Sequence, residues 1–70
     1  MTEQEFIDMI IEEAGLGVEA TPETKLDDVG FDSMANMIVV TLIDQHFEKT
    51  ITEPINRTCD TFGDVYKLTQ

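Results

Sequence analysis

Apolar residues recur at helical spacing along this chain, and nowhere do they alternate with polar residues as in a half-buried strand. The first such segment opens with Thr2 and Glu5, whose spacing matches a capping box, in which each side chain satisfies a free backbone N–H group. The apolar face that follows consists of Phe6, Ile7, Ile10, Ile11 and Ala14. Gly15 and Gly17 predict its end. The pattern favours an all-helical protein.

Three further helices are predicted beyond this one. Residues 33–48 are apolar on almost every side, and such a helix is usually covered on more than one face. Pro54 suits the first turn of a short helix that ends near Cys59. Thr61 and Asp64 have capping-box spacing and open a last helix. Its inward residues are expected to be Phe62, Val65, Tyr66 and Leu68.

A long connection, residues 16–31, separates the first two predicted helices. A loop of this length in a small domain is usually functional or held down by its own side chains. The apolar residues expected to anchor it are Leu16, Val18, Leu26, Val29 and Phe31.

The helical wheel of residues 33–48 predicts which side faces the core. The inward arc is expected to hold Asn36, Val39, Val40, Ile43 and Phe47. The opposite side holds Met34, Ile38, Thr41 and Gln45, with Met37 and Leu42 at the margins. The predicted core as a whole is Phe6, Ile10, Val40, Ile43, Phe47, Phe62 and Leu68.

Size and charge limit what the chain can do. Its 70 residues suffice for a single domain, residues 1–70. The net charge of −11 disfavours nucleic acid and anionic membranes and favours partners with basic patches. Residues 1–32 carry ten acids and only one lysine. No apolar stretch is long enough to span a bilayer, and the single cysteine suits a cytoplasmic, reducing compartment.

No set of catalytic or metal-binding residues is apparent. The only histidine, His46, and the only cysteine, Cys59, give no argument for a catalytic pair, so we do not expect an enzyme. Cys59 is expected to pack as a small apolar residue. Asp27, Asp28 and Asp32 lack the order of a calcium loop, and we expect no metal.

The stretch Gly30-Phe31-Asp32-Ser33-Met34 stands directly before the longest helix. Asp32 is a favoured N-cap, because its carboxylate accepts a hydrogen bond from the first turn. Ser33 then lies at the electropositive end of the helix, which favours a phosphate. A phosphodiester on Ser33 is therefore well placed.

This motif, together with the order of helices in a short acidic chain, resembles the acyl carrier proteins over essentially the whole sequence. The resemblance implies a four-helix bundle of the acyl-carrier type, with a long first loop and a short third helix. It implies that a phosphopantetheinyl transferase attaches 4′-phosphopantetheine from coenzyme A to Ser33, beside the cap Asp32. The protein would be a monomeric carrier of acyl thioesters in fatty-acid or related lipid or polyketide biosynthesis. Its other partners would be acyl-transferring and synthase enzymes.

Two further sets of residues follow from the resemblance. The lining of an acyl pocket between the second and third helices is expected to include Val40, Ile43, Ile51, Ile55 and Cys59. The partner-binding face on the second helix is expected to include Met34, Met37, Ile38, Thr41 and Leu42. Related carriers of fatty-acid synthesis usually have acids along this helix, whereas Asp44 and Glu48 stand here only near its end. We therefore expect partner enzymes to bind this face through apolar contacts.

Two alternative functions remain open from the sequence. One is a carrier of aminoacyl groups, like the D-alanyl carriers, whose motif can also read Asp-Ser-Met. The other is an unmodified helical interaction module that binds a partner through the apolar second helix.

The uneven charge predicts that salt stabilises the fold. The ten acids of residues 1–32 repel one another, and added salt screens that repulsion. We expect the melting temperature to rise between low and moderate ionic strength, measured by circular dichroism. A melting temperature that is constant or falls over this range contradicts the charge argument.

Overall fold

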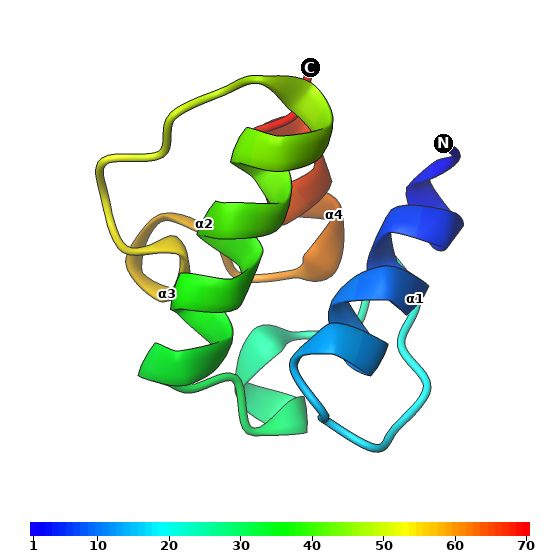
Figure 1. Ribbon diagram of the computed structural model, residues 1–70. Helices are drawn as coiled ribbons and strands as arrows, with labels where there is room; N and C mark the ends of the chain where they lie inside the picture. Colours follow the sequence, from blue (N-terminus) through cyan, green and yellow to red (C-terminus); the bar gives the residue numbers. More distant parts are fainter.

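The structure is a computed structural model that describes all residues, 1–70, and contains no strands. Four α-helices and one short 3₁₀ helix follow one another along the chain (Figure 1). They are α1 (Glu3–Glu13), η1 (Leu26–Val29), α2 (Ser33–Phe47), α3 (Ile55–Thr58) and α4 (Phe62–Lys67). The predicted all-helical bundle, with its long first loop and short third helix, is confirmed. The helix η1 within the loop was not predicted.

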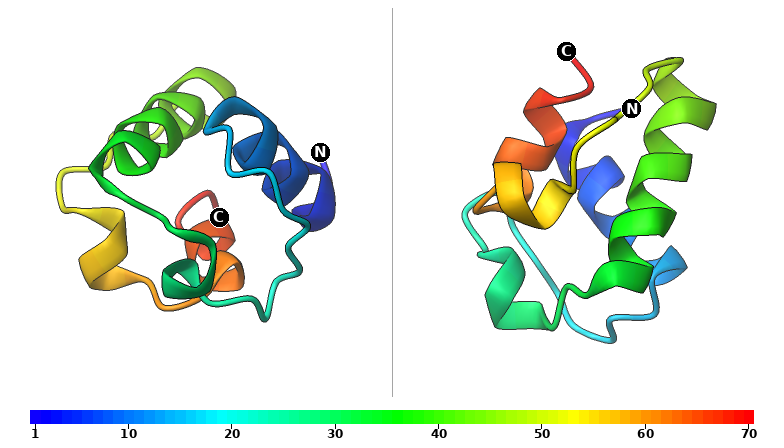
Figure 2. Two further views of the ribbon diagram at one scale, coloured as in Figure 1. Left: turned by 90° about the horizontal axis from the view of Figure 1, so that it is seen from below. Right: turned by 90° about the vertical axis from the view of Figure 1, so that its left-hand side faces the viewer.

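The helix α2 is the central element of the bundle. It contacts α1 on one side and α3 on the other, while α1 also contacts α4. Figure 1 shows α2 between α1 and α3, and Figure 2 shows the four helices surrounding a common interior. None of the helices combines the length and apolar content needed to cross a bilayer.

Both predicted capping boxes are formed. The Thr2 hydroxyl accepts from the Glu5 N–H at 3.1 Å, and the Glu5 carboxylate accepts from the Thr2 N–H at 2.7 Å. Thr61 and Asp64 make the same reciprocal pair at 3.1 and 3.2 Å. The bond from the Thr2 N–H lowers the pKa of the Glu5 carboxyl, because it favours the charged form. The bonds from the Asp60 and Thr61 N–H groups lower the pKa of the Asp64 carboxyl for the same reason. Their stabilising effect is therefore present at neutral pH and is lost as the pH falls through the lowered pKa values.

The core joins α1, α2 and α4 around Phe6. The Phe6 ring meets Phe47 edge-on at a centroid distance of 5.5 Å and Tyr66 at 5.9 Å. Of the predicted core residues, Phe6, Ile10, Ile43 and Phe62 are fully buried, whereas Val40, Phe47 and Leu68 are half-buried and pack against them. Cys59 is buried among apolar side chains, as predicted. Ala20 and Thr69 are also buried, which the sequence did not indicate.

The buried face of α2 differs from the predicted one. The buried residues are Ala35, Val39, Leu42 and Ile43. The observed arc is rotated by roughly 60° from the prediction, at 100° per residue. Leu42, predicted at the margin of the exposed side, is only 8% exposed, and Ala35 is buried as well. The rotation follows from the packing of α1 and α3 on opposite sides of a helix that is apolar nearly all round.

The long loop is fixed to the segment that precedes α4. Leu26 N–H donates to the Asp60 carbonyl at 3.0 Å, and Phe62 N–H donates to the Thr24 carbonyl at 3.1 Å. Gly63 N–H donates to the Pro22 carbonyl at 2.8 Å. Leu26 and Phe31 are buried and Leu16 and Val29 pack against the core, as predicted. Val18 is 43% exposed, so its predicted role as an anchor is wrong.

The backbone contact at Gly63 predicts the effect of adding a methyl group there. A Cβ atom at Gly63 would lie 3.0 Å from the Pro22 carbonyl oxygen, which is backbone and cannot turn aside. Helix propensity alone favours alanine over glycine by about 1 kcal/mol. We expect the contact to outweigh this preference, so that Gly63→Ala lowers the free energy of unfolding by about 1 kcal/mol or more.

Urea denaturation of Gly63→Ala beside wild type measures this effect. Lys67→Ala, at an exposed position of the same helix, is the control and should change stability little. If Gly63→Ala is more stable than wild type, the loop at Pro22 moves to accept the Cβ atom. The gain in helix propensity then outweighs the cost of the contact.

Candidate functional site

The residues before α2 form a turn that is held in place from the core. The helix η1 ends at Val29, and its C-cap Gly30 has a φ of 71°, in the left-handed region that glycine adopts readily. The chain then places Phe31 in the core, where its ring meets Phe62 edge-on at a centroid distance of 6.4 Å. This anchor fixes the point at which α2 begins.

Asp32 is the N-cap of α2. Its backbone is extended, with φ −109° and ψ −172°, and its carboxylate accepts a hydrogen bond from the Ala35 N–H at 2.9 Å. The Asp32 carbonyl accepts from the Asn36 N–H at 2.9 Å, which is the first bond of the helix. Phe31 points inward, Asp32 caps the helix, and the following residue lies at the surface.

Ser33 is the first residue of α2 and is exposed. It is also the only serine in the chain. No acidic residue occupies the first turn of α2 itself, so the N–H groups and the positive end of the helix dipole lie beside its hydroxyl. The position therefore has room for an attached group and an electrostatic preference for phosphate.

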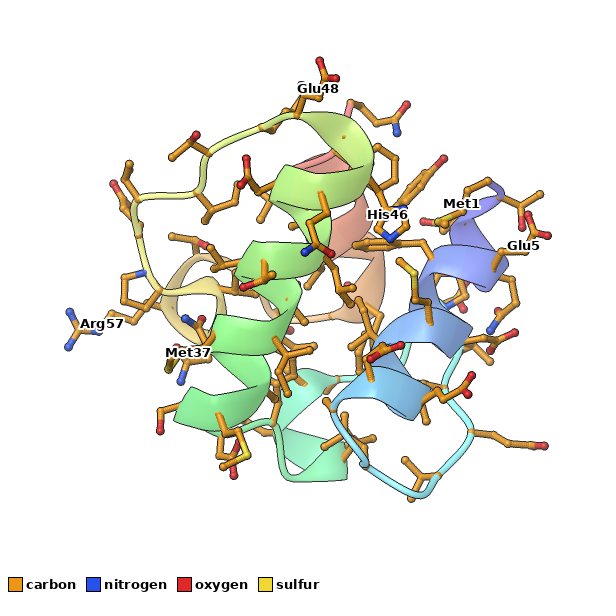
Figure 3. All side chains as sticks on the ribbon, viewed as in Figure 1. Met1, Glu5, Met37, His46, Glu48 and Arg57 are labelled. Atoms are coloured by element: carbon orange, nitrogen blue, oxygen red, sulfur yellow. The ribbon has the colours of Figure 1, made fainter.

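Neither the only histidine nor the only cysteine is placed to activate the Ser33 hydroxyl. His46 lies at the far end of α2, about 20 Å away along the axis at about 1.5 Å per residue. Figure 3 shows His46 toward one end of α2 and Met37 in the other half. Cys59 is buried, and burial raises the pKa of its thiol.

Acidic side chains reach this region from the loop. Asp27 and Asp28 are exposed on η1, which ends three residues before the cap Asp32. On α2 itself, Asp44 is exposed near the C-terminal end. The acidic residues that precede Ser33 most closely in sequence are therefore on η1 and at the cap.

The five residues predicted to form a partner-binding face are only partly available at the surface. Met34 and Met37 are 67% and 69% exposed, and Thr41 is also exposed. Ile38 is half-buried and packs against the core. Leu42 belongs to the core, so its predicted place on an exposed strip is wrong.

The five predicted pocket residues divide into two groups. Val40 and Ile51 are half-buried and line an open groove between α2 and the segment before α3. The other members of the groove are Asn36, Met37, Thr41, Thr52, Glu53 and Pro54. Ile43, Ile55 and Cys59 are buried in the core behind it and do not line the groove.

Comparison with known protein families matches residues 4–68 to the family described as phosphopantetheine attachment site. The chain belongs to this family. Neither the curated proteins nor the solved structures compared with the chain gave a match. The family match spans all four helices of the bundle and supports an acyl-carrier-type domain.

Membership in the phosphopantetheine attachment family identifies the chain as a carrier domain for that group. Its members carry 4′-phosphopantetheine covalently on a serine, and the carrier domains are not themselves catalytic. The residues present fit that group, since the chain has one serine and exposes it at a helix N-terminus.

Asn36 is a residue of this region whose role the sequence did not reveal. Its side-chain oxygen accepts a hydrogen bond from the Ile55 N–H at 2.5 Å and so joins α2 to α3. The sequence could have indicated such a hydrogen bond, because Asn36 is the one polar residue on the predicted inward arc. A polar group facing a core generally requires a hydrogen-bond partner.

The cap of α2 predicts how strongly Asp32 contributes to stability. Asp32→Ala removes the acceptor for the Ala35 N–H and should lower the free energy of unfolding by about 1 kcal/mol. Asp32→Asn keeps a side-chain oxygen of similar capping ability, so its free energy of unfolding should fall much less than that of Asp32→Ala. Chemical denaturation of the two variants and wild type gives both values. If Asp32→Ala is as stable as wild type, the Asp32 cap does not stabilise the folded protein.

Proposed function

We propose that Ser33 is the attachment site and that the protein carries acyl groups as thioesters in fatty-acid or related lipid or polyketide biosynthesis. The observation that carries the proposal is that the only serine of a chain in this family is exposed at the start of its longest helix, directly after a capping aspartate.

The modification joins Ser33 to coenzyme A by phosphoryl transfer. The Ser33 Oγ forms a bond to the phosphorus next to the pantetheine, and the pyrophosphate bond of coenzyme A breaks. Adenosine 3′,5′-bisphosphate leaves, and the hydroxyl proton passes to a base of the transferase. The product is a phosphodiester on Ser33.

The residues around Ser33 support this product without taking part in its chemistry. When bound, the group supplies a terminal thiol that holds acyl chains as thioesters. The N-terminus of α2 favours the phosphodiester charge. Asp32 holds the first turn in place, and the Phe31 anchor keeps Ser33 at the surface. A tethered cargo reaches partner active sites at high effective concentration.

Partner enzymes are proposed to contact two kinds of surface near Ser33. Asp27, Asp28 and Asp32 offer negative charge to a phosphopantetheinyl transferase with a basic face. Met34 and Met37 offer apolar contact on α2 to acyl-transferring and synthase enzymes. The protein is proposed to act as a monomer in the cytoplasm, where a reducing environment suits its single free cysteine.

An aminoacyl cargo is the second candidate function. The groove that contains Val40 and Ile51 also includes Thr41, Thr52 and Glu53, which offer hydrogen-bonding groups to a polar cargo. Loading assays with fatty-acyl and amino-acid activating enzymes distinguish the two cargoes.

Intact-mass spectrometry tests the attachment site. We expect wild type, incubated with coenzyme A and a phosphopantetheinyl transferase, to gain the mass of one phosphopantetheinyl group. Ser33→Ala should gain none while keeping the helical circular-dichroism spectrum, because the side chain is exposed. Thr50→Ala, which removes an exposed hydroxyl outside α2 and outside the predicted partner-binding face, is the control and should be modified like wild type. Modification of Ser33→Ala overturns the assignment.

A further inference from the structure

The helix α3 depends on a side chain from another helix for its first turn. It has only four residues, and its N-cap, Pro54, makes no side-chain capping bond. The Ile55 N–H donates instead to the Asn36 side-chain oxygen at 2.5 Å. Asn36 therefore performs the capping role from α2, 19 residues away in sequence.

This hydrogen bond lies at the boundary between a closed interior and an open groove. Behind it, Val39, Ile43 and Ile55 are completely buried, and Cys59 at the end of α3 is buried as well. In front of it is the groove that contains Val40 and Ile51, with Thr41, Thr52 and Glu53 among its polar members. Separating α3 from α2 would break the bond and expose the interior.

Asn36 also lies on the same side of α2 as Ser33. The two residues are three positions apart, which places them roughly 60° apart around the helix axis at 100° per residue. Val40 is one turn further along the same side. The attachment point, Asn36 and one wall of the groove therefore lie on the same side of α2.

We propose that Asn36 determines cargo specificity by holding α3 closed against α2, so that the carried group lies in the open groove and stays out of the interior. This inference rests on the proposed function of Ser33. The groove accommodates a short or polar group, with apolar contact from Val40 and Ile51 and hydrogen-bonding groups at the rim. A long alkyl chain gains shelter only by parting the two helices, which leaves the Ile55 N–H without its acceptor.

The first experiment measures closure in the unmodified protein and uses Cys59 as the reporter. Cys59 is the only cysteine and is buried at the end of α3, so its labelling by a thiol reagent reports separation of α3. We expect Asn36→Ala to raise the labelling rate about tenfold, equivalent to about 1.4 kcal/mol of opening. Asn36→Asp keeps an acceptor oxygen and should label nearly as slowly as wild type.

Thr2→Ala is the control for general loss of stability. It removes a cap on α1, remote in sequence from α3, and should leave Cys59 labelling close to the wild-type rate. If Asn36→Ala remains folded and labels at the wild-type rate, Asn36 does not hold α3. Equal acceleration by Thr2→Ala and Asn36→Ala also overturns the proposal, because the effect is then global.

The second experiment measures where the cargo lies. Acetyl, hexanoyl and dodecanoyl groups are attached to the arm through stable amide links, and NMR signals of the protein are compared along the series. In wild type we expect changes at Val40, Ile51 and Thr52 but none at Val39 and Ile43. In Asn36→Ala the dodecanoyl group should also shift Val39 and Ile43.

The wild-type series keeps the proposal testable if Asn36→Ala does not fold. Shifts at Val39 and Ile43 of wild type with the dodecanoyl group show that the interior opens despite Asn36 and overturn the proposal. Failure of Ser33 to accept any arm contradicts the proposed function alone, because the labelling of Cys59 in the unmodified protein does not require it.

Discussion

The hydrogen bonds between the long loop and the segment before α4 are the constraint on which the position of the site depends. They join Leu26 to Asp60 and Gly63 to Pro22, so the loop is held along its second half. η1 and the Phe31 anchor follow directly from this pairing, and α2 begins only after them. An exposed serine after an unattached loop would have no fixed orientation toward a partner. Here its position is set by the same contacts that complete the core.

The helix ends could be predicted from local chemistry because their causes are local. Thr2 and Asp64 take part in reciprocal capping pairs that need only three-residue spacing, and both pairs are formed. Pro54 marked the start of α3 for an equally local reason, since proline lacks an N–H and has a fixed φ. The Asp32 cap belongs with them. The site's backbone was therefore largely predictable.

The orientation of α2 was not predictable in the same way. A helix that is apolar on nearly every side gives a weak directional signal, so its buried face is decided by the neighbours that cover it. Leu42 and Ala35 are core residues of a helix that contacts both α1 and α3, and those contacts depend on the whole topology. The bond from Asn36 to Ile55 likewise joins residues far apart in sequence, and only the packing of α3 brings them together.

The burial of Cys59 also affects the chemical selectivity of the molecule. A carrier that holds a thioester has a reactive carbonyl near its own surface, and any free thiolate of the same chain could capture the cargo by exchange. Burial raises the pKa of the Cys59 thiol, which keeps it protonated at neutral pH and a poor nucleophile. In the proposed carrier, this burial would protect the loaded form against acylation of Cys59 and would leave the thiol of the arm as the one that exchanges cargo with enzymes.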